Sequence, residues 1–126
     1  MNKLPSELLE EFLNSVHEWE TEYAIAFDNV ATEDKRLQDL LHELEFTESY
    51  KEKNQVATKL KNSRKERRVN KDKVLMLENV INFFADSQNR KTLNLMEQLL
   101  GKQRKREKML LSERTYHTRV SVEKVD

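Results

Sequence analysis

The sequence predicts an all-α fold, in which a long, coiled-coil-like antiparallel helical hairpin carries an acidic N-terminal helical region packed on it. Apolar residues recur at three- and four-residue spacings over most of the chain, as they do on one face of a helix. Only one Gly and one Pro occur in 126 residues, which leaves little for the tight turns of a β-rich fold. Hydrophobic residues make up 37% of the chain and charged residues another 37%, so the core must be thin, and thin cores favour helical hairpins.

The first predicted element is an acidic helical region over residues 5–46. Pro5-Ser6 followed by glutamates is typical of a helix start, with the Ser6 hydroxyl as N-cap. An apolar face follows, and a second stripe continues it as far as Phe46; the residues of the first face are Phe12, Val16, Trp19, Tyr23, Phe27 and Val30. The sequence leaves open whether this region is kinked near residue 31 or continuous.

The second and third predicted elements are a long helix over residues 49–86 and a helix over residues 90–113. Ser49 and Glu52 fit a capping box at the start of the long helix. A heptad seam follows without interruption: Val56, Leu60, Ser63, Arg67, Asn70, Val74, Leu77, Ile81 and Phe84. The last helix has a similar stripe: Leu93, Met96, Leu100, Gln103, Glu107 and Leu110. Residues 1–114 are expected to form a single helical domain, and residues 115–126 an extended tail.

A short link between two long helices makes them antiparallel neighbours, which predicts how the last two helices pair. Matching Phe84 with Leu93 brings Leu77 near Leu100. The same register places Arg67 and Asn70 close to Glu107. These three residues are therefore predicted to form an internal polar layer that fixes the register at some cost in stability.

Opposite charges are segregated along the chain, although the formal net charge is zero. Residues 1–50 hold 13 acidic and 3 basic side chains, whereas residues 51–120 hold 8 acidic and 19 basic ones. The acidic half could therefore neutralise the basic half within one molecule.

Basic side chains that lie off the seam are the candidate binding residues. They form two runs, one on each of the last two helices, and these runs are expected to meet at one basic end of the hairpin and to bind a protein partner or phosphates. The residues of the two runs are Lys59, Lys61, Lys65, Arg68, Lys71, Lys102, Arg104, Lys105 and Lys108. Three interpretations stay open: a solvated helical face, a surface for nucleic-acid phosphates, or a surface for carboxylates, including those of the same chain.

Aromatic residues indicate a second candidate surface. Trp19, Tyr23 and Phe27 form a stripe that a thin core would leave partly exposed, so dimerisation or a partner could cover it. Tyr116, in the strand-like tail, is a further interface candidate. The alternative is that the stripe is core and the tail is frayed.

The sequence favours a non-enzymatic protein. No Gly-rich phosphate loop or nucleophile motif is present, and no cofactor is expected. The pair Asp39 and His42 is a weak metal pattern without a second copy, and the acidic clusters resemble ordinary solvated faces. The absence of Cys and of a long apolar run leads us to expect a cytoplasmic protein that does not enter a membrane.

One resemblance bears on origin. A basic helical segment, Lys61-Asn-Ser-Arg-Lys-Glu-Arg-Arg68, is followed by a leucine-rich helix and the closing segment Arg114-Thr-Tyr-His-Thr-Arg119. This combination, over residues 50–120, resembles small helical proteins of unknown function encoded by tailed phages of Gram-positive bacteria. Thr118 departs from that pattern, which carries proline at this position. The resemblance implies a phage accessory protein in the host cytoplasm and names no activity.

These observations together predict a small helical interaction module that binds a protein partner, such as a host factor, and that could form a homodimer. The alternative is a nucleic-acid-binding accessory protein that uses the basic end of the hairpin. A metal-dependent nucleotide hydrolase is a minor third option.

Overall fold

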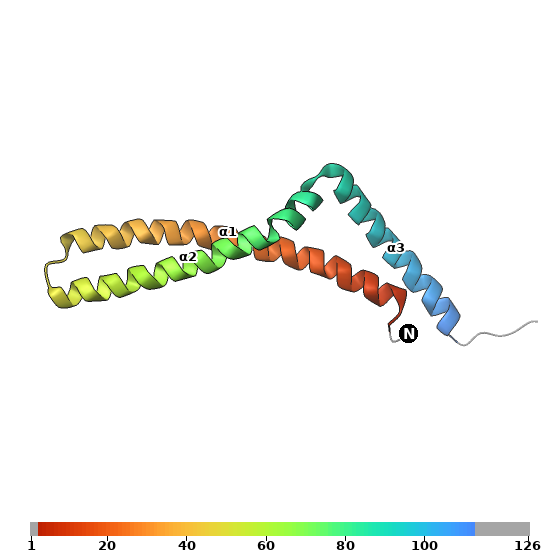
Figure 1. Cartoon of the computed structure of the whole chain (residues 1–126). Helices are drawn as coiled ribbons and strands as arrows, with labels where there is room; N and C mark the ends of the chain where they lie inside the picture. Colours follow the sequence, from red (N-terminus) through yellow and green to blue (C-terminus); the bar gives the residue numbers. More distant parts are fainter. Residues whose placement is uncertain (1–2, 113–126) are drawn as a thin grey trace, which may run out of the picture.

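A computed structural model of the chain describes residues 3–112. Three helices make up nearly all of this part: α1 (Pro5–Phe46), α2 (Tyr50–Ala85) and α3 (Ser87–Leu111). α1 and α2 run antiparallel, and α3 folds back toward the N-terminal end of α1 (Figure 1). The predicted all-α fold with an antiparallel hairpin is confirmed, whereas the predicted tail at 115–126 lies outside the described residues.

α1 is a single helix of 42 residues, so the region near residue 31 is continuous. Pro5 stands in its first turn, where a missing backbone N–H leaves no hydrogen bond unmade. Leu4 is the N-cap residue, and it provides no side-chain cap. The predicted N-cap role of Ser6 is therefore wrong: Pro5 already starts the helix, and the Ser6 hydroxyl donates to Glu107 of α3 instead.

The two connections contain neither Gly nor Pro. Ser49 accepts a hydrogen bond from the Glu52 backbone N–H at 3.4 Å, which confirms the predicted cap of α2. A single extended residue, Asp86 (φ −63°, ψ 131°), separates α2 from α3, so α3 begins three residues before the predicted position 90. The Asn89 side chain donates to the Phe83 carbonyl at 2.9 Å, which satisfies a backbone group left open at the end of α2.

The heptad seam of α2 faces α1. Val56, Ser63, Val74 and Leu77 of this seam are buried, and its other five positions are half-buried. α2 packs mainly along α1 and much less on α3. The predicted seam positions are thus confirmed, but they belong to a hairpin that α2 makes with α1.

The apolar core lies where all three helices meet. Leu13 and Val16 of α1 pack with Leu93 and Leu100 of α3, and Phe84 of α2 packs against this cluster. Phe84 and Leu93 are therefore close, as predicted for residues next to the turn. Leu77 does not belong to the cluster that holds Leu100, so the predicted pairing of these two residues is not observed.

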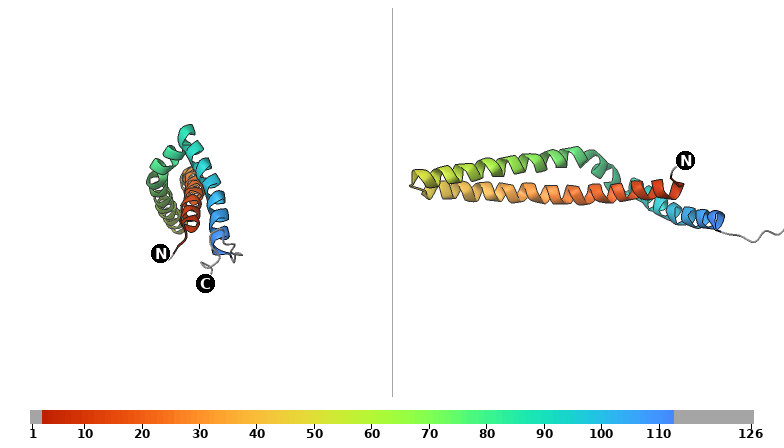
Figure 2. Two further views of the ribbon diagram at one scale, coloured as in Figure 1. Left: turned by 90° about the vertical axis from the view of Figure 1, so that its right-hand side faces the viewer. Right: turned by 90° about the horizontal axis from the view of Figure 1, so that it is seen from below.

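Among residues 3–112, only α1 and α2 form the far end of the hairpin. Figure 2 shows α1 and α2 extending together well beyond the region covered by α3. Packing there depends on the α1–α2 contact alone, and it includes Leu40 of α1 and Val56 of α2 as buried apolar residues. This two-helix arm carries the basic run of α2.

Candidate interaction surface along the hairpin

The nine predicted basic residues are all exposed, but they form two separate sets. The set on α2 lies along the two-helix arm, where Lys59 borders a cavity together with Arg36 and Leu40 of α1. The set on α3 lies beside the first turns of α1, because Arg104 pairs with Glu10 at 3.0 Å. The predicted single basic end is therefore wrong, because α1, and not α3, is the antiparallel neighbour of the basic run of α2.

The internal polar layer exists, but its members have other partners than predicted. The Arg67 Nε–H donates to Asp34 Oδ1 at 2.6 Å, and Asn70 accepts from the Asn29 side chain at 3.1 Å. Both partners belong to α1. Arg67 therefore does not pair with Glu107, and the layer fixes the register of α1 against α2.

Glu33 is the buried charge of this layer, with only 6% of its surface exposed. Its carboxylate accepts hydrogen bonds from the Ser63 hydroxyl and from Arg36 Nη1, each at 2.5 Å. A buried carboxylate is stable only when it is paired and hydrogen-bonded, and Glu33 meets both conditions. Ser63, a small residue on the α2 seam, leaves the room that this side chain occupies.

Glu107 does not belong to this polar layer and lies instead beside the first turn of α1. Its carboxylate accepts hydrogen bonds from the Ser6 backbone N–H at 3.0 Å, from the Ser6 hydroxyl, and from the Gln103 side chain at 2.9 Å. The Ser6 hydroxyl is the main reason why the pKa of Glu107 lies below its ordinary value, and partial desolvation opposes this effect. Glu107 thus caps the first turn of α1 from α3.

One further ion pair and one histidine–carboxylate contact join α1 to α3. Arg90 donates two hydrogen bonds to Glu20, at 2.9 and 3.3 Å, and these bonds raise the pKa of the Arg90 guanidinium. His17 Nε2 lies 3.4 Å from Glu97. The pairs Arg90–Glu20 and Arg104–Glu10 show that acidic side chains of α1 neutralise part of the basic C-terminal half of the chain.

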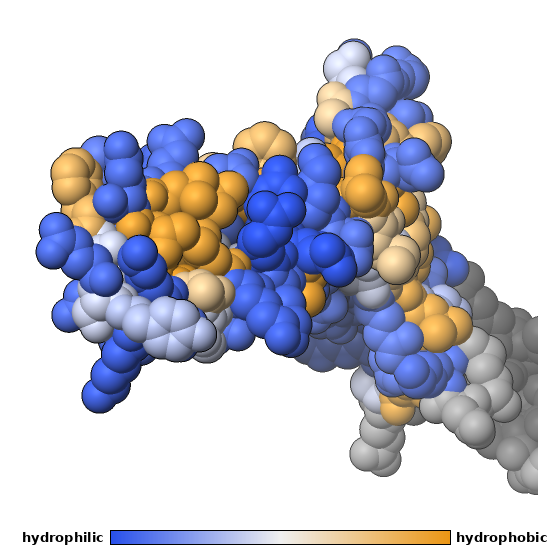
Figure 3. All heavy atoms as spheres, turned by 60° about the vertical axis from the view of Figure 1, so that its left-hand side comes forward, coloured by the Kyte–Doolittle hydropathy of each residue, from blue (hydrophilic) through white to orange (hydrophobic). Residues whose placement is uncertain are grey.

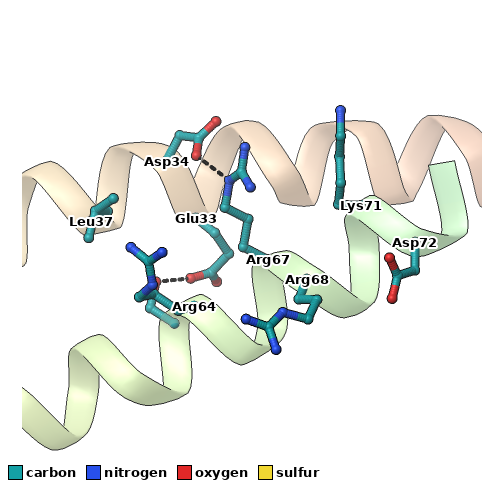
Figure 4. Close-up of a pocket in the computed structure, with 9 residues that line it drawn as sticks. Glu33, Asp34, Leu37, Arg64, Arg67, Arg68, Lys71 and Asp72 are labelled. Carbon is teal, nitrogen blue, oxygen red and sulfur yellow. Dashed lines mark hydrogen bonds and ion pairs between the residues drawn. The ribbon is translucent and has the colours of Figure 1, made fainter. Parts of the chain in front are cut away.

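A groove runs along one side of the two-helix arm, and we call it the hairpin groove. It consists of two adjoining cavities of about 340 and 270 Å³, which share Asp34, Arg67 and Lys71 in their walls. Figure 4 shows the larger cavity, to which α1 supplies Glu33 and Asp34, and α2 supplies Asp72 and all four cations. The smaller cavity is lined partly by apolar residues: Phe27, Val30, Ala31 and Val74.

Three cations of the hairpin groove have no ion-pair partner among the described residues. Arg64, Arg68 and Lys71 line it, and none of them makes an ion pair with another residue in the range 3–112. Arg67, by contrast, is held by Asp34. The groove therefore combines an apolar end with a row of unpaired positive charges. Arg64 was not among the predicted binding residues, although it continues the three- and four-residue spacing of Lys61, Arg68 and Lys71.

The aromatic residues of α1 fall into two groups. Trp19 is half-buried against the three-helix core, and Tyr23 is half-buried and stacked on Phe27 with ring centroids 6.0 Å apart. Phe27 is 57% exposed at the apolar end of the hairpin groove. The predicted stripe is thus core at Trp19 and surface at Phe27, while Tyr116 lies outside the described residues.

Large apolar side chains are common on the surface. Figure 3 shows hydrophobic residues gathered in separate patches between charged ones. On α2 they include Val69, Met76 and Phe83, of which Met76 is 81% exposed. Exposed apolar patches of this kind on helices often form contacts with other chains.

Metal-binding groups and membrane-spanning stretches are both absent from the described residues. Within residues 3–112, no three His, Asp or Glu side chains gather in a group that could hold a metal ion; His42 lies 3.7 Å from Glu45. None of the three described helices has a stretch apolar enough to cross a membrane.

Comparison of the chain with models of protein families, with curated proteins and with solved structures finds no match.

Proposed function

We propose that the protein is a non-enzymatic interaction module whose hairpin groove binds an acidic, amphipathic helical segment of a protein partner. One observation carries the proposal: Arg64, Arg68 and Lys71 line the groove without an ion pair in the described part of the chain, next to the exposed Phe27. A helix laid in such a groove would place an apolar residue against Phe27 and Val74, and carboxylates against the cations.

The groove suits a helix better than a small molecule. It is a long depression between two parallel walls, and its polar residues are spread along it rather than convergent on one point. Small-molecule sites are usually enclosed, largely apolar cavities with a few converging polar groups. The resemblance of residues 50–120 to small phage proteins is the reason to extend the proposal to a phage accessory protein with a partner in the host cell.

Site-specific cross-linking tests this proposal. A photoreactive phenylalanine analogue at Phe27 is expected to capture a partner in an extract of the source cells, and the same analogue at Phe46 is the control. Phe46 is 71% exposed but lies at the end of α1, away from the groove. The captured protein is then purified and titrated by calorimetry against the unmodified chain and the Arg68→Glu and Lys71→Glu variants. We expect each substitution to weaken binding about tenfold or more; equal capture at Phe46, or unchanged affinity, would refute the proposal.

Nucleic-acid binding is the second candidate, because eight of the nine predicted basic residues make no ion pair within the described range. The geometry limits it. Lys61, Arg64, Arg68 and Lys71 follow one side of α2 over ten residues, or about 15 Å, so they can reach only a few phosphates.

Fluorescence anisotropy with a labelled 20-base-pair duplex and a single strand distinguishes the two candidates. Each phosphate contact contributes about −0.9 to the slope of log affinity against log salt on duplex DNA. We expect a shallow slope and no binding at physiological salt. Tight binding there that is lost in the variant Arg68→Glu/Lys71→Glu, with the fold intact by circular dichroism, would favour the nucleic-acid function instead.

A further inference from the structure

The outer face of α2 carries apolar residues at a strict seven-residue interval. Val69, Met76 and Phe83 are 57%, 81% and 56% exposed, and neither α1 nor α3 covers them. Residues seven apart on a helix lie almost directly in line, so these side chains form a straight row about 21 Å long. We call this row, together with the half-buried Val80 beside it, the outer stripe.

We propose that a second copy of this chain covers the outer stripe, with the two α2 helices antiparallel and Met76 on the twofold axis. The row is symmetric about its middle residue. In an antiparallel pair centred on Met76, Val69 of one copy faces Phe83 of the other, and the same contact is repeated on the other side of the axis. This is the self-complementary arrangement that a twofold interface requires.

The charges beside the outer stripe fit the same arrangement. One flank carries Lys65, Asp72, Asn79 and Asp86, again seven residues apart. When the helices are antiparallel about Met76, Lys65 faces Asp86 of the second copy, and Asp72 faces Asn79. Each contact occurs twice by symmetry, and no like charges are opposed on this flank.

The other flank is also compatible. It carries Glu66, Lys73, Val80 and Ser87, so that Lys73 lies over Val80 of the second copy and Glu66 over Ser87. The Lys73 stem can cover an apolar side chain while its ammonium group reaches water. In a parallel pair in register the two flanks would face each other, so that Lys65 would lie beside Glu66 of the second copy. The basic runs at residues 59–73, each with eight basic and two acidic side chains, would then also lie side by side, which is unfavourable. The antiparallel pair keeps these basic runs apart and is therefore the arrangement we propose.

Two single helices that pair over this length bury a small surface area, near the lower limit of about 1,200 Å² for specific complexes. The dimer is therefore expected to dissociate on dilution. Its stripe lies on the outer face of α2, whereas the hairpin groove lies between α2 and α1, so the dimer and the proposed function are tested by different variants.

Engineered disulfides test the arrangement, because the chain has no Cys of its own. Under mild oxidation, Met76→Cys is expected to form a covalent dimer, since the two residues meet at the axis within disulfide range. Val69→Cys alone should stay monomeric, and a mixture of Val69→Cys with Phe83→Cys should cross-link. Self-linked Val69→Cys at the same rate as Met76→Cys would overturn the proposal, because it indicates parallel pairing or random collision.

Sedimentation of the full chain over a concentration series gives an independent measurement. We expect a reversible dimer in which Met76→Lys shifts the equilibrium to monomer, because it opposes two ammonium groups at the axis. The matched control is Leu41→Lys on α1, which is also exposed, at 51%, and should leave the dimer unchanged. Circular dichroism verifies that both variants fold. A chain that stays monomeric at the highest concentration reached, or equal loss in both variants, would overturn the proposal.

Discussion

Ser6 and Glu107 are 101 positions apart in the chain, and both the backbone N–H and the hydroxyl of Ser6 donate to the Glu107 carboxylate. This contact joins the first turn of α1 to the last turns of α3. Leu93 and Leu100 make the apolar part of the same α1–α3 contact. α3 is thus joined to α2 through Asp86 at its start and bound to α1 through Glu107 near its end.

The first prediction concerns pH. Because the pKa of Glu107 is lowered in the folded protein, its carboxylate stabilises the fold above the unfolded pKa of about 4.3, and this contribution is lost as pH falls through the lower folded value. We expect Glu107→Gln to lower the melting temperature at pH 7. The difference from the unmodified chain should shrink progressively below about pH 4.3. Thermal unfolding at a series of pH values measures this; a difference that is independent of pH would contradict it.

The second prediction separates two leucines of α3. Leu93 is 1% exposed in the core cluster, whereas Leu95 is 61% exposed. Leu93→Ala should cost about 2 to 5 kcal/mol of unfolding free energy, because it leaves a cavity among Leu13, Val16 and Leu100. Leu95→Ala should stay within about 0.5 kcal/mol. Urea denaturation of both variants provides the comparison, and equal losses would show that α3 does not dock as described.

The sequence predicts the helices and the seam well, because both depend on local spacing. The heptad from Val56 to Phe84 required no knowledge of the partner, and every one of its positions is at least half-buried. The capping by Ser49 is local as well. Side-chain periodicity identifies which face of a helix is buried, and here it does so correctly.

The partner of that face could not be predicted in the same way. The rule that a short link makes neighbouring helices antiparallel applies to residues 47–49 as well as to Asp86, and the sequence does not rank the two hairpins. The partners of the polar seam residues are equally ambiguous, since Arg67 could form an ion pair with either Glu107 or Asp34. Packing decides: α1 is long enough to cover the whole α2 seam, and it supplies Asn29 and Asp34 at the matching level.

The third prediction concerns the buried pair Glu33 and Ser63. Ser63→Ala removes one of the two hydrogen bonds to a buried carboxylate, so it should cost about 1 to 3 kcal/mol. Adding Glu33→Leu to Ser63→Ala should restore the free energy of unfolding to at least that of the unmodified chain. The reason is that two apolar side chains lose no favourable hydration when they are buried. Denaturant unfolding of the single and double variants tests this. A double variant less stable than Ser63→Ala alone would mean that the carboxylate contributes more than its burial costs.

The last prediction follows from the central position of α1. A fragment that starts at Ser49 keeps α2 and α3, but it exposes Val56, Val74 and Leu77, which α1 covers in the full chain. The same deletion uncovers Leu93 and Leu100 of α3, because Leu13 and Val16 are removed.

α2 and α3 contact each other little, and most of the stability of helices in proteins comes from tertiary packing of their apolar faces. We therefore expect the fragment to lose helix content per residue and to melt without a cooperative transition. The matched control is a fragment of residues 1–86, which keeps α1 with α2 and should retain a cooperative transition. Circular dichroism at 222 nm during heating measures both. If the fragment from Ser49 unfolds cooperatively with the helix content of the full chain, α2 and α3 form the stable hairpin and α1 is the accessory helix.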